Sequence, residues 1–593
     1  MPRPSIIDTR RDQMFPVLGP SEVERLRRFG KVRSYAPGEA LAKAGEAGHG
    51  LAIVLTGTVE ITRRDGSASG VPIITHRPGA FMGELAQLSG RPALVDAYAQ
   101  EPVDALIIPP DQLRALLIAE AELGERIMRA LILRRVGLIE TGGGGPVIVG
   151  QPEDGDVLRL ASFLSRNGHP HQNLDSRTDP EARALVERFH VDPGELPIVL
   201  CPSGELLRNP TEADLARCIG LVGSIDSTRV YDVAIIGAGP AGLAAAVYAA
   251  SEGLSTLVLD CRSFGGQAGA SARIENYLGF PTGISGMALM ARAYNQAQKF
   301  GVEMAIPDEA TRLEVAPMSD GYALRLINTE RVSARSVIIA SGARYRRLDV
   351  PDLDLFEGSS VHYWASPLEA KLCAGQEVAL VGGGNSAGQA VVYLASQVAK
   401  VWLLVRGQDL GASMSRYLID RIEGLSNVEV VKQAQVTRLE GAQGMLEAIR
   451  WQDGLGEEVR WPVRHLFLFV GAAPNTDWLS DSGVILDAKG FVMTGADIDA
   501  HRRSFETSRR GVFAIGDVRA GSVKRVAAAV GEGAQVVATL HAFLAEHSRA
   551  DFKSRSLASY RYTACRPLAD LERACWPGLI SLSIVGMSSE TVG

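Results

Sequence analysis

Cysteine is scarce in this 593-residue chain, which has only six. Sparse cysteines of this kind are typical of ordinary thiols rather than of a disulfide framework. No two of them form a CxxC pair, so a redox centre made of neighbouring cysteines is excluded. The six are Cys201, Cys218, Cys261, Cys373, Cys565 and Cys575.

Long apolar runs and an excess of positive charge are also missing. The formal net charge is −7 and the pI about 5.9, which argues against a general nucleic-acid binder. No run of about 18 uncharged apolar residues exists, so no membrane span is expected. The first 19 residues have no apolar core and no small-residue cleavage site, so no secretory signal is expected. These absences predict a cytoplasmic protein without nucleic-acid or membrane partners, and no pattern indicates a metal site.

The chain is long enough for several domains, at about 100–200 residues each. Residues 1–140 alternate short β-like runs with glycine turns and end in a helical stretch, which predicts a β jelly-roll followed by helices. After a four-glycine linker, residues 146–222 alternate strands and helices as in an α/β sandwich. Residues 230–548 contain two βαβ starts, and residues 549–593 form an extension without clear periodicity, expected to be poorly ordered.

The first βαβ start carries the strongest motif of the chain. An apolar strand at 231–236 runs into a GxGxxG turn and an alanine-rich helix. Gly237 suits the tight turn, Gly239 lets the backbone approach a pyrophosphate, and Gly242 allows close packing of helix and strand. A second strand ends in an acid at the position where a ribose is usually bound. The motif predicts a dinucleotide site at Gly237, Gly239, Pro240, Ala241, Gly242 and Asp260, which the resemblance given below assigns to FAD.

The second βαβ start lies at 377–387 and repeats the fingerprint with a third small residue, alanine. Its second strand ends in Arg406 instead of an acid. Arginine there can pair with a ribose 2′-phosphate, so NADPH is favoured over NADH. The residues predicted to bind it are Gly382, Gly384, Asn385, Ser386, Ala387 and Arg406. Two such units in one chain suggest hydride transfer from a nicotinamide to a flavin.

Further motifs follow in a specific order at 265–267, 274–277, 340–343, 470–476 and 511–517. Together they make residues 230–545 resemble the low-molecular-weight thioredoxin reductases. The resemblance implies two Rossmann-type domains, with an FAD domain at 230–346 and 471–548 and an NAD(P)H domain inserted at 347–470. It also implies a homodimer. By this resemblance the remaining FAD residues are Gly266, Gln267, Asn276, Gly342, Gly516, Asp517, Lys524, Arg525 and Val526.

The resemblance fails where the family carries its catalytic CxxC. Trp364 and Pro367 stand at the two cysteine positions, and neither can be a thiolate nucleophile. Cys373 is alone nearby and is expected to be buried and inert. The catalytic residues and the electron acceptor are therefore unknown. The candidate acceptors are a partner protein's disulfide, a quinone, a second flavin, oxygen and a mobile Cys565–Cys575 pair. The alternative is a flavin-based redox sensor with little turnover.

Residues 146–222 resemble the thioredoxin and glutaredoxin fold, with Pro197 in the place of its cis-proline. No cysteine stands near 151–155, where the redox CxxC of that fold would precede the first helix. A redox-inactive docking domain is therefore expected. The alternative is a thiol site at Cys201.

The first 140 residues resemble cyclic-nucleotide-binding domains. Gly83 and Glu84 match the family's ribose-binding pair. Ala93 stands where an arginine would pair with the cyclic phosphate, and Arg91 is near but out of register. The resemblance therefore implies a possible small-ligand site at Gly83 and Glu84, while the substitution favours a degenerate scaffold or another ligand over a cyclic nucleotide.

Overall fold

The computed structural model describes residues 6–563, apart from 64–70, 84, 89–90, 142, 223–224, 316–320, 329, 358 and 443. Cys565 and Cys575 therefore lie outside the described residues, as does Glu84. The chain divides into a unit Met1–His541 and a unit Ala542–Gly593.

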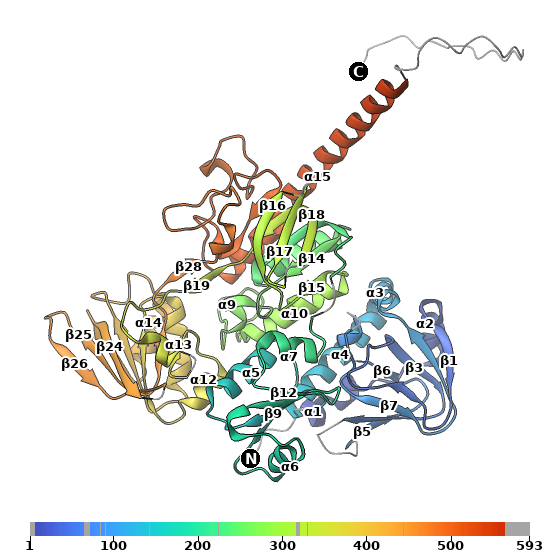
Figure 1. The fold of residues 1–593 in the computed structure, drawn as a ribbon, viewed down its shortest axis with the longest axis horizontal. Helices are drawn as coiled ribbons and strands as arrows, with labels where there is room; N and C mark the ends of the chain where they lie inside the picture. Colours follow the sequence, from blue (N-terminus) through green and yellow to red (C-terminus); the bar gives the residue numbers. More distant parts are fainter. Residues whose placement is uncertain are drawn as a thin grey trace, which may run out of the picture. The chain divides into compact units, whose positions relative to one another are not determined.

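Two four-stranded antiparallel sheets form the N-terminal β-domain, drawn in blue in Figure 1. Apolar residues alternate along their strands and bury one face of each sheet, as the jelly-roll expectation requires. The first sheet has the order β1 (Lys31–Tyr35), β8 (Val103–Ile108), β3 (Leu51–Thr56), β6 (Phe81–Met82). The second has the order β2 (Ala40–Ala42), β7 (Asp96–Ala99), β4 (Val59–Arg63), β5 (Val71–His76). The helices are α1 (Ile6–Met14), α2 (Pro20–Leu26), α3 (Pro110–Ala119) and α4 (Ala121–Thr141).

A small mixed sheet forms the middle α/β unit. Its order is β10 (Gln172–Asp175), β9 (Val147–Gly150), β11 (Ile198–Leu200), β12 (Leu206–Arg208), with only β10 and β9 parallel. The peptide bond before Pro197 is cis, directly ahead of β11. Asp154 caps the first helix by accepting hydrogen bonds from two backbone N–H groups. The helices are α5 (Gly155–Arg166), α6 (Pro180–Arg188) and α7 (Glu212–Cys218).

The cysteines of this unit correct one expectation. Cys201 and Cys218 form a disulfide, with their Cα atoms 6.0 Å apart. The prediction of ordinary thiols is therefore wrong for this pair. Cys201 follows β11 and Cys218 ends α7, so the fold brings together two residues that lie 17 apart in sequence and match no redox motif.

The first large sheet has the order β15 (Glu303–Ala305), β14 (Thr256–Leu259), β13 (Val230–Ile236), β18 (Arg331–Ile339), β17 (Tyr322–Leu326), β16 (Ala310–Val315). β29 (Val512–Ala514) also pairs with β18, in parallel. The strands from β15 to β18 are parallel, and the uncharged run of β13 is buried on both faces. The helices around it are α8 (Pro240–Ser251), α9 (Gly266–Gly269) and α10 (Gly286–Lys299).

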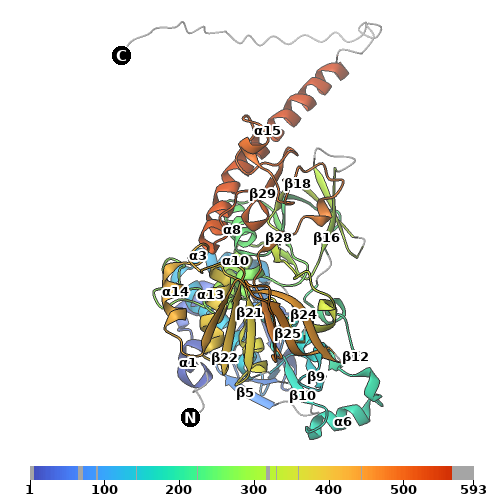
Figure 2. The same ribbon diagram turned by 90° about the vertical axis from the view of Figure 1, so that its left-hand side faces the viewer.

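The second large sheet is parallel throughout, in the order β20 (Val361–His362), β27 (Leu466–Leu468), β21 (Glu377–Val381), β22 (Lys400–Val405), β23 (Val428–Lys432). Its helices are α11 (Leu353–Phe356), α12 (Pro367–Leu372), α13 (Asn385–Ala395) and α14 (Arg416–Glu423). Figure 2 shows β21 and β22 beside an antiparallel sheet of β24 (Gln435–Ala442), β25 (Met445–Gln452) and β26 (Glu458–Trp461), and the two share one apolar core. The chain passes from the first large sheet to the second and back again. The two connecting segments contain β19 (Ala343–Tyr345) and β28 (Ala472–Pro474), which pair with each other as an antiparallel ribbon.

The last helix, α15 (Val526–Thr563), continues past residue 548, where the third unit was predicted to end. Its window Val526–Glu546 has the length and composition of a membrane span, although a third of it is buried. Within the first unit Val536 and Leu540 are fully buried, and Glu532 bonds the loop at Gly516. This part of α15 therefore packs one face against the core of the first unit.

Candidate active site

Both glycine-rich turns open onto one cavity of about 1570 Å³. Every residue predicted to bind FAD or NADPH lines this cavity except Gly242. The parallel strands β13 and β21 each end at a turn that faces it, as expected for ligands at the carboxyl ends of parallel strands. Residues from two separate motifs, about 145 positions apart, thus share one space.

The first turn contains three glycines with three different constraints. Gly237 has φ +112°, and a Cβ there would lie 2.1 Å from the Ala340 carbonyl oxygen. A Cβ on Gly242 would lie 1.9 Å from the Gly237 carbonyl oxygen, so this glycine serves helix–strand packing. No atom of the described chain lies within 4 Å of a Cβ built on Gly239. Gly239 therefore leaves open space directly at the N-terminus of α8.

The acid of the first motif, Asp260, is held by the backbone. One of its oxygens accepts a hydrogen bond from Ala238 N (2.9 Å), and the other accepts from Arg262 N (3.1 Å) and Ser263 N (3.2 Å). Burial raises the pKa of its carboxyl group, while the three N–H groups oppose that rise. The carboxylate is thus fixed at the cavity wall and keeps lone pairs for a ribose hydroxyl.

The second turn repeats this arrangement. A Cβ on Gly382 would lie 2.6 Å from the Phe469 carbonyl oxygen, whereas no atom lies within 4 Å of one on Gly384. Arg406 follows β22, is exposed and lines the cavity. The side chain of Asn385 has another role, because its oxygen accepts a hydrogen bond from Ser415 N (2.6 Å) at the start of α14.

Asp517 lies on the cavity wall between α8 and α15. Burial raises the pKa of its carboxyl group. Lys524 Nζ donates to the Asp517 carbonyl oxygen (3.0 Å), and Gln267 donates to the Ala343 carbonyl oxygen. Glu532 accepts a hydrogen bond from Gly516 N (2.6 Å) and so fixes this turn. Sequence reasoning missed Glu532, which lies in the second turn of α15 and outside the motifs.

Trp364, which stands at the first cysteine position expected from the sequence resemblance, lines the cavity. Its indole N–H donates to Glu369 Oε1 (2.7 Å), and the Arg166 guanidinium lies 4.0 Å from its ring centroid. Arg166 also lines the cavity although it belongs to the middle α/β unit, and burial lowers its pKa to about 10. Pro367, at the second cysteine position, begins α12. Nothing in the sequence near Arg166 signals this role, because only the docking of the unit creates it.

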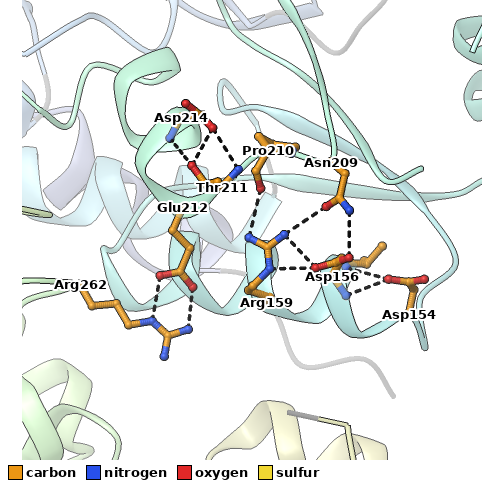
Figure 3. A network of polar contacts seen from close by, with 10 residues as sticks. Asp154, Asp156, Arg159, Asn209, Pro210, Thr211, Glu212, Asp214 and Arg262 are labelled. Atoms are coloured by element: carbon orange, nitrogen blue, oxygen red, sulfur yellow. Dashed lines mark hydrogen bonds and ion pairs between the residues drawn. The ribbon is translucent and has the colours of Figure 1, made fainter. Parts of the chain in front are cut away.

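The middle unit is joined to the cavity wall by a two-pronged ion pair (Figure 3). Arg262 donates to both oxygens of Glu212, at 2.7 and 3.1 Å. Asn167 Nδ2 donates to the Arg262 carbonyl oxygen (3.1 Å). Arg262 comes two residues after Asp260, so the same loop contacts the middle unit and carries the predicted ribose acid.

Two cysteines of the described residues, Cys261 and Cys373, are free thiols. Cys261 lines the cavity, and desolvation together with the Asp260 carboxylate raises its pKa to about 12. It is therefore a neutral thiol at neutral pH and a poor nucleophile. Cys373 is fully buried, as expected, and burial raises its pKa to about 12.

In the β-domain, Gly83 is described but Glu84 is not, so the predicted pair cannot be placed together. Arg134 donates to the Gly83 carbonyl oxygen (3.0 Å) from α4. Ala93 is buried and pairs through its backbone with Gly45 and Glu46. It borders a smaller cavity of about 440 Å³, lined mainly by residues 38–49. Among the described residues, the basic side chains that line this cavity are Lys43 and His49.

Two family models match the chain. Residues 231–533 match the pyridine nucleotide-disulphide oxidoreductases, and residues 32–120 match the cyclic nucleotide-binding domain. The F component of the alkyl hydroperoxide reductase of Escherichia coli is 33% identical over 54% of this chain and 59% of its own length. Thioredoxin reductase of Mycoplasmopsis pulmonis is 31% identical over 52% of this chain and 96% of its own length. Among solved structures, T. acidophilum thioredoxin reductase is 30% identical, covers 53% of this chain and 98% of its own, and has a TM-score of 0.49.

Proposed function

Because this chain belongs to the pyridine nucleotide-disulphide oxidoreductase family, we propose that it is an NADPH-dependent flavoprotein oxidoreductase that holds FAD. One observation carries the proposal: two glycine-rich turns, each at the end of a parallel strand, open onto the same 1570 Å³ cavity. When bound, FAD accepts a hydride from the nicotinamide and supplies the redox chemistry. The protein supplies binding, orientation and exclusion of water.

Each group of predicted FAD residues would contact a different part of the cofactor. The open space at Gly239 fits a pyrophosphate, which α8 would meet with the unpaired N–H groups of its first turn. Asp260 would accept a hydrogen bond from the adenosine ribose. Asp517 would meet the ribityl chain, and Lys524 with its neighbours would border the flavin ring.

NADPH would lie against the second turn in the same manner. The open space at Gly384 fits its pyrophosphate, and the exposed guanidinium of Arg406 would pair with the 2′-phosphate. Arginine suits this role because its planar fork bonds two phosphate oxygens at once.

The electron acceptor would be external. This is supported by Trp364, which lines the cavity under the Arg166 guanidinium and offers no thiol to receive electrons. The names of two relatives, thioredoxin reductase and alkyl hydroperoxide reductase, favour a disulfide on a partner protein. We propose that the middle unit is a thioredoxin-like docking domain, supported by its four-stranded mixed sheet with flanking helices and by the Arg262–Glu212 pair. The homodimer remains a prediction, which light scattering on the purified chain checks.

The test is an absorption spectrum of the purified full chain, an anaerobic NADPH titration, and steady-state NADPH oxidation with an artificial acceptor. We expect one FAD per chain, bleaching by NADPH, and turnover. A colourless protein that cannot be reconstituted with FAD would refute the proposal. Bleaching without turnover on any acceptor would instead favour the flavin-based redox sensor.

A further inference from the structure

Three side chains of the kinds that bind transition metals lie close together beside the second large sheet, which contains β20 and β27. His362, Cys373 and His465 are all buried, and their ligand atoms lie within 4.8 Å of one another. His362 ends β20, His465 precedes β27, and Cys373 follows α12. None of the three lines the large cavity. Ala379 N, in the middle of β21, donates a hydrogen bond to the His465 carbonyl oxygen (3.0 Å). The cluster therefore lies inside the domain and apart from the glycine turn that follows β21.

We propose that His362, Cys373 and His465 bind a zinc ion. His362 Nε2 and His465 Nδ1 are 3.1 Å apart. Two nitrogens at that separation, each ~2.05 Å from a zinc ion, subtend about 98° at the metal, near the ~109° of a tetrahedron. One thiolate with two imidazoles is a ligand set that zinc accepts, and it leaves a fourth position for water. Among the described residues, no fourth ligand atom joins the cluster.

The three side chains lie in the apolar core beside the second large sheet. The neighbouring side chains, such as Val378 and Phe467, are apolar. A buried thiol is common in apolar cores, so the zinc proposal rests on the close approach of all three ligand atoms.

The site would act by joining three chain segments. His362 and Cys373 bracket residues 363–372, which carry Trp364 to the cavity wall. His465, about 100 positions away in sequence, directly precedes β27. Glu369 in this segment also binds Trp364 and the backbone N–H of Ser366 (2.9 Å). A zinc ion would therefore fix the segment that replaces the family's dithiol.

The experiment uses the full FAD-loaded chain, purified without a histidine tag after growth with zinc, and measures metals by inductively coupled plasma mass spectrometry. We expect close to one zinc per chain, a fall of about tenfold or more in Cys373→Ala, and no change in the matched control Cys261→Ala. Protein grown with cobalt should show a thiolate-to-cobalt charge-transfer band that Cys373→Ala abolishes. Retained FAD absorbance reports that each variant is folded, and it is read separately from the metal.

Two outcomes would overturn the proposal. One is wild-type protein with neither zinc nor a cobalt charge-transfer band. The other is Cys373→Ala that keeps its zinc. If Cys373→Ala does not fold, labelling of Cys373 in the wild type decides: a chelator should accelerate the reaction of this thiol, and an unchanged rate would refute the site.

Discussion

Replacing Gly239 by valine separates binding of FAD from folding of the chain. Gly239 has φ −77° and ψ −176°, an extended conformation that valine adopts without strain. A Cβ there meets no atom within 4 Å, so the side chain enters the cavity without displacing any described residue. The fold should lose only about 1 kcal/mol, from a poorer residue at the N-terminus of α8.

FAD should suffer far more, because the valine methyl groups fill the space proposed for the pyrophosphate. Loss of two N–H bonds to a charged phosphate, at about 1.5–3 kcal/mol each, costs about 3–6 kcal/mol. At about 1.4 kcal/mol per factor of ten, FAD binding weakens by about 10²–10⁴-fold. The purified variant should be nearly colourless and should keep a cooperative unfolding transition close to that of the flavin-free wild type.

The assays are flavin per chain by absorbance, FAD affinity by titration of the apoprotein, and Tm. Gly384→Val is the matched control, since its Cβ also meets no atom within 4 Å. It should keep FAD and weaken NADPH. Gly242→Ala should lower the Tm directly, because its Cβ would lie 1.9 Å from a carbonyl oxygen. Stoichiometric FAD in Gly239→Val would refute the assignment of the first turn.

Arg406→Ala should raise the KM for NADPH about tenfold or more and leave that for NADH nearly unchanged, because only NADPH carries the 2′-phosphate; equal effects in steady-state kinetics would exclude this role. Anaerobic titration should take up two electrons per FAD, because neither sulfur of the Cys201–Cys218 disulfide lines the cavity. If the wild type takes up four electrons per FAD and Cys201→Ser/Cys218→Ser takes up two, this disulfide is an electron acceptor. If uptake falls to two electrons only when the two tail cysteines are replaced, the tail is the acceptor. The same double variant should lose about 3 kcal/mol of unfolding free energy in a urea titration, because the bridge closes a loop of 17 residues; an unchanged midpoint would contradict this. Calorimetry should show no micromolar binding of cyclic AMP, since Ala93 offers no cation, and such binding would overturn this interpretation.

The two nucleotide turns could be predicted from the sequence because a glycine-rich turn between a strand and a helix is a local motif. Gly237 needs positive φ within that turn, and Gly242 needs to approach the Gly237 carbonyl oxygen five residues earlier. The close approach of Ala340 to Gly237 comes from a distant strand and was not predictable in this way. The order of the later motifs then indicated the family, and the absence of CxxC was legible from the sequence itself. The jelly-roll was likewise indicated by its alternating apolar residues.

Only the tertiary structure decided which distant residues meet. Cys201 pairs with Cys218 because a strand and a helix end at the same place, and Arg166 reaches Trp364 because one unit docks on another. His362 and His465 are 103 positions apart yet 3.1 Å from each other. Such contacts follow from the packing of whole elements, so no local pattern of residues encodes them. Local sequence fixes backbone conformation, whereas the geometry between elements arises only when their apolar faces are buried together.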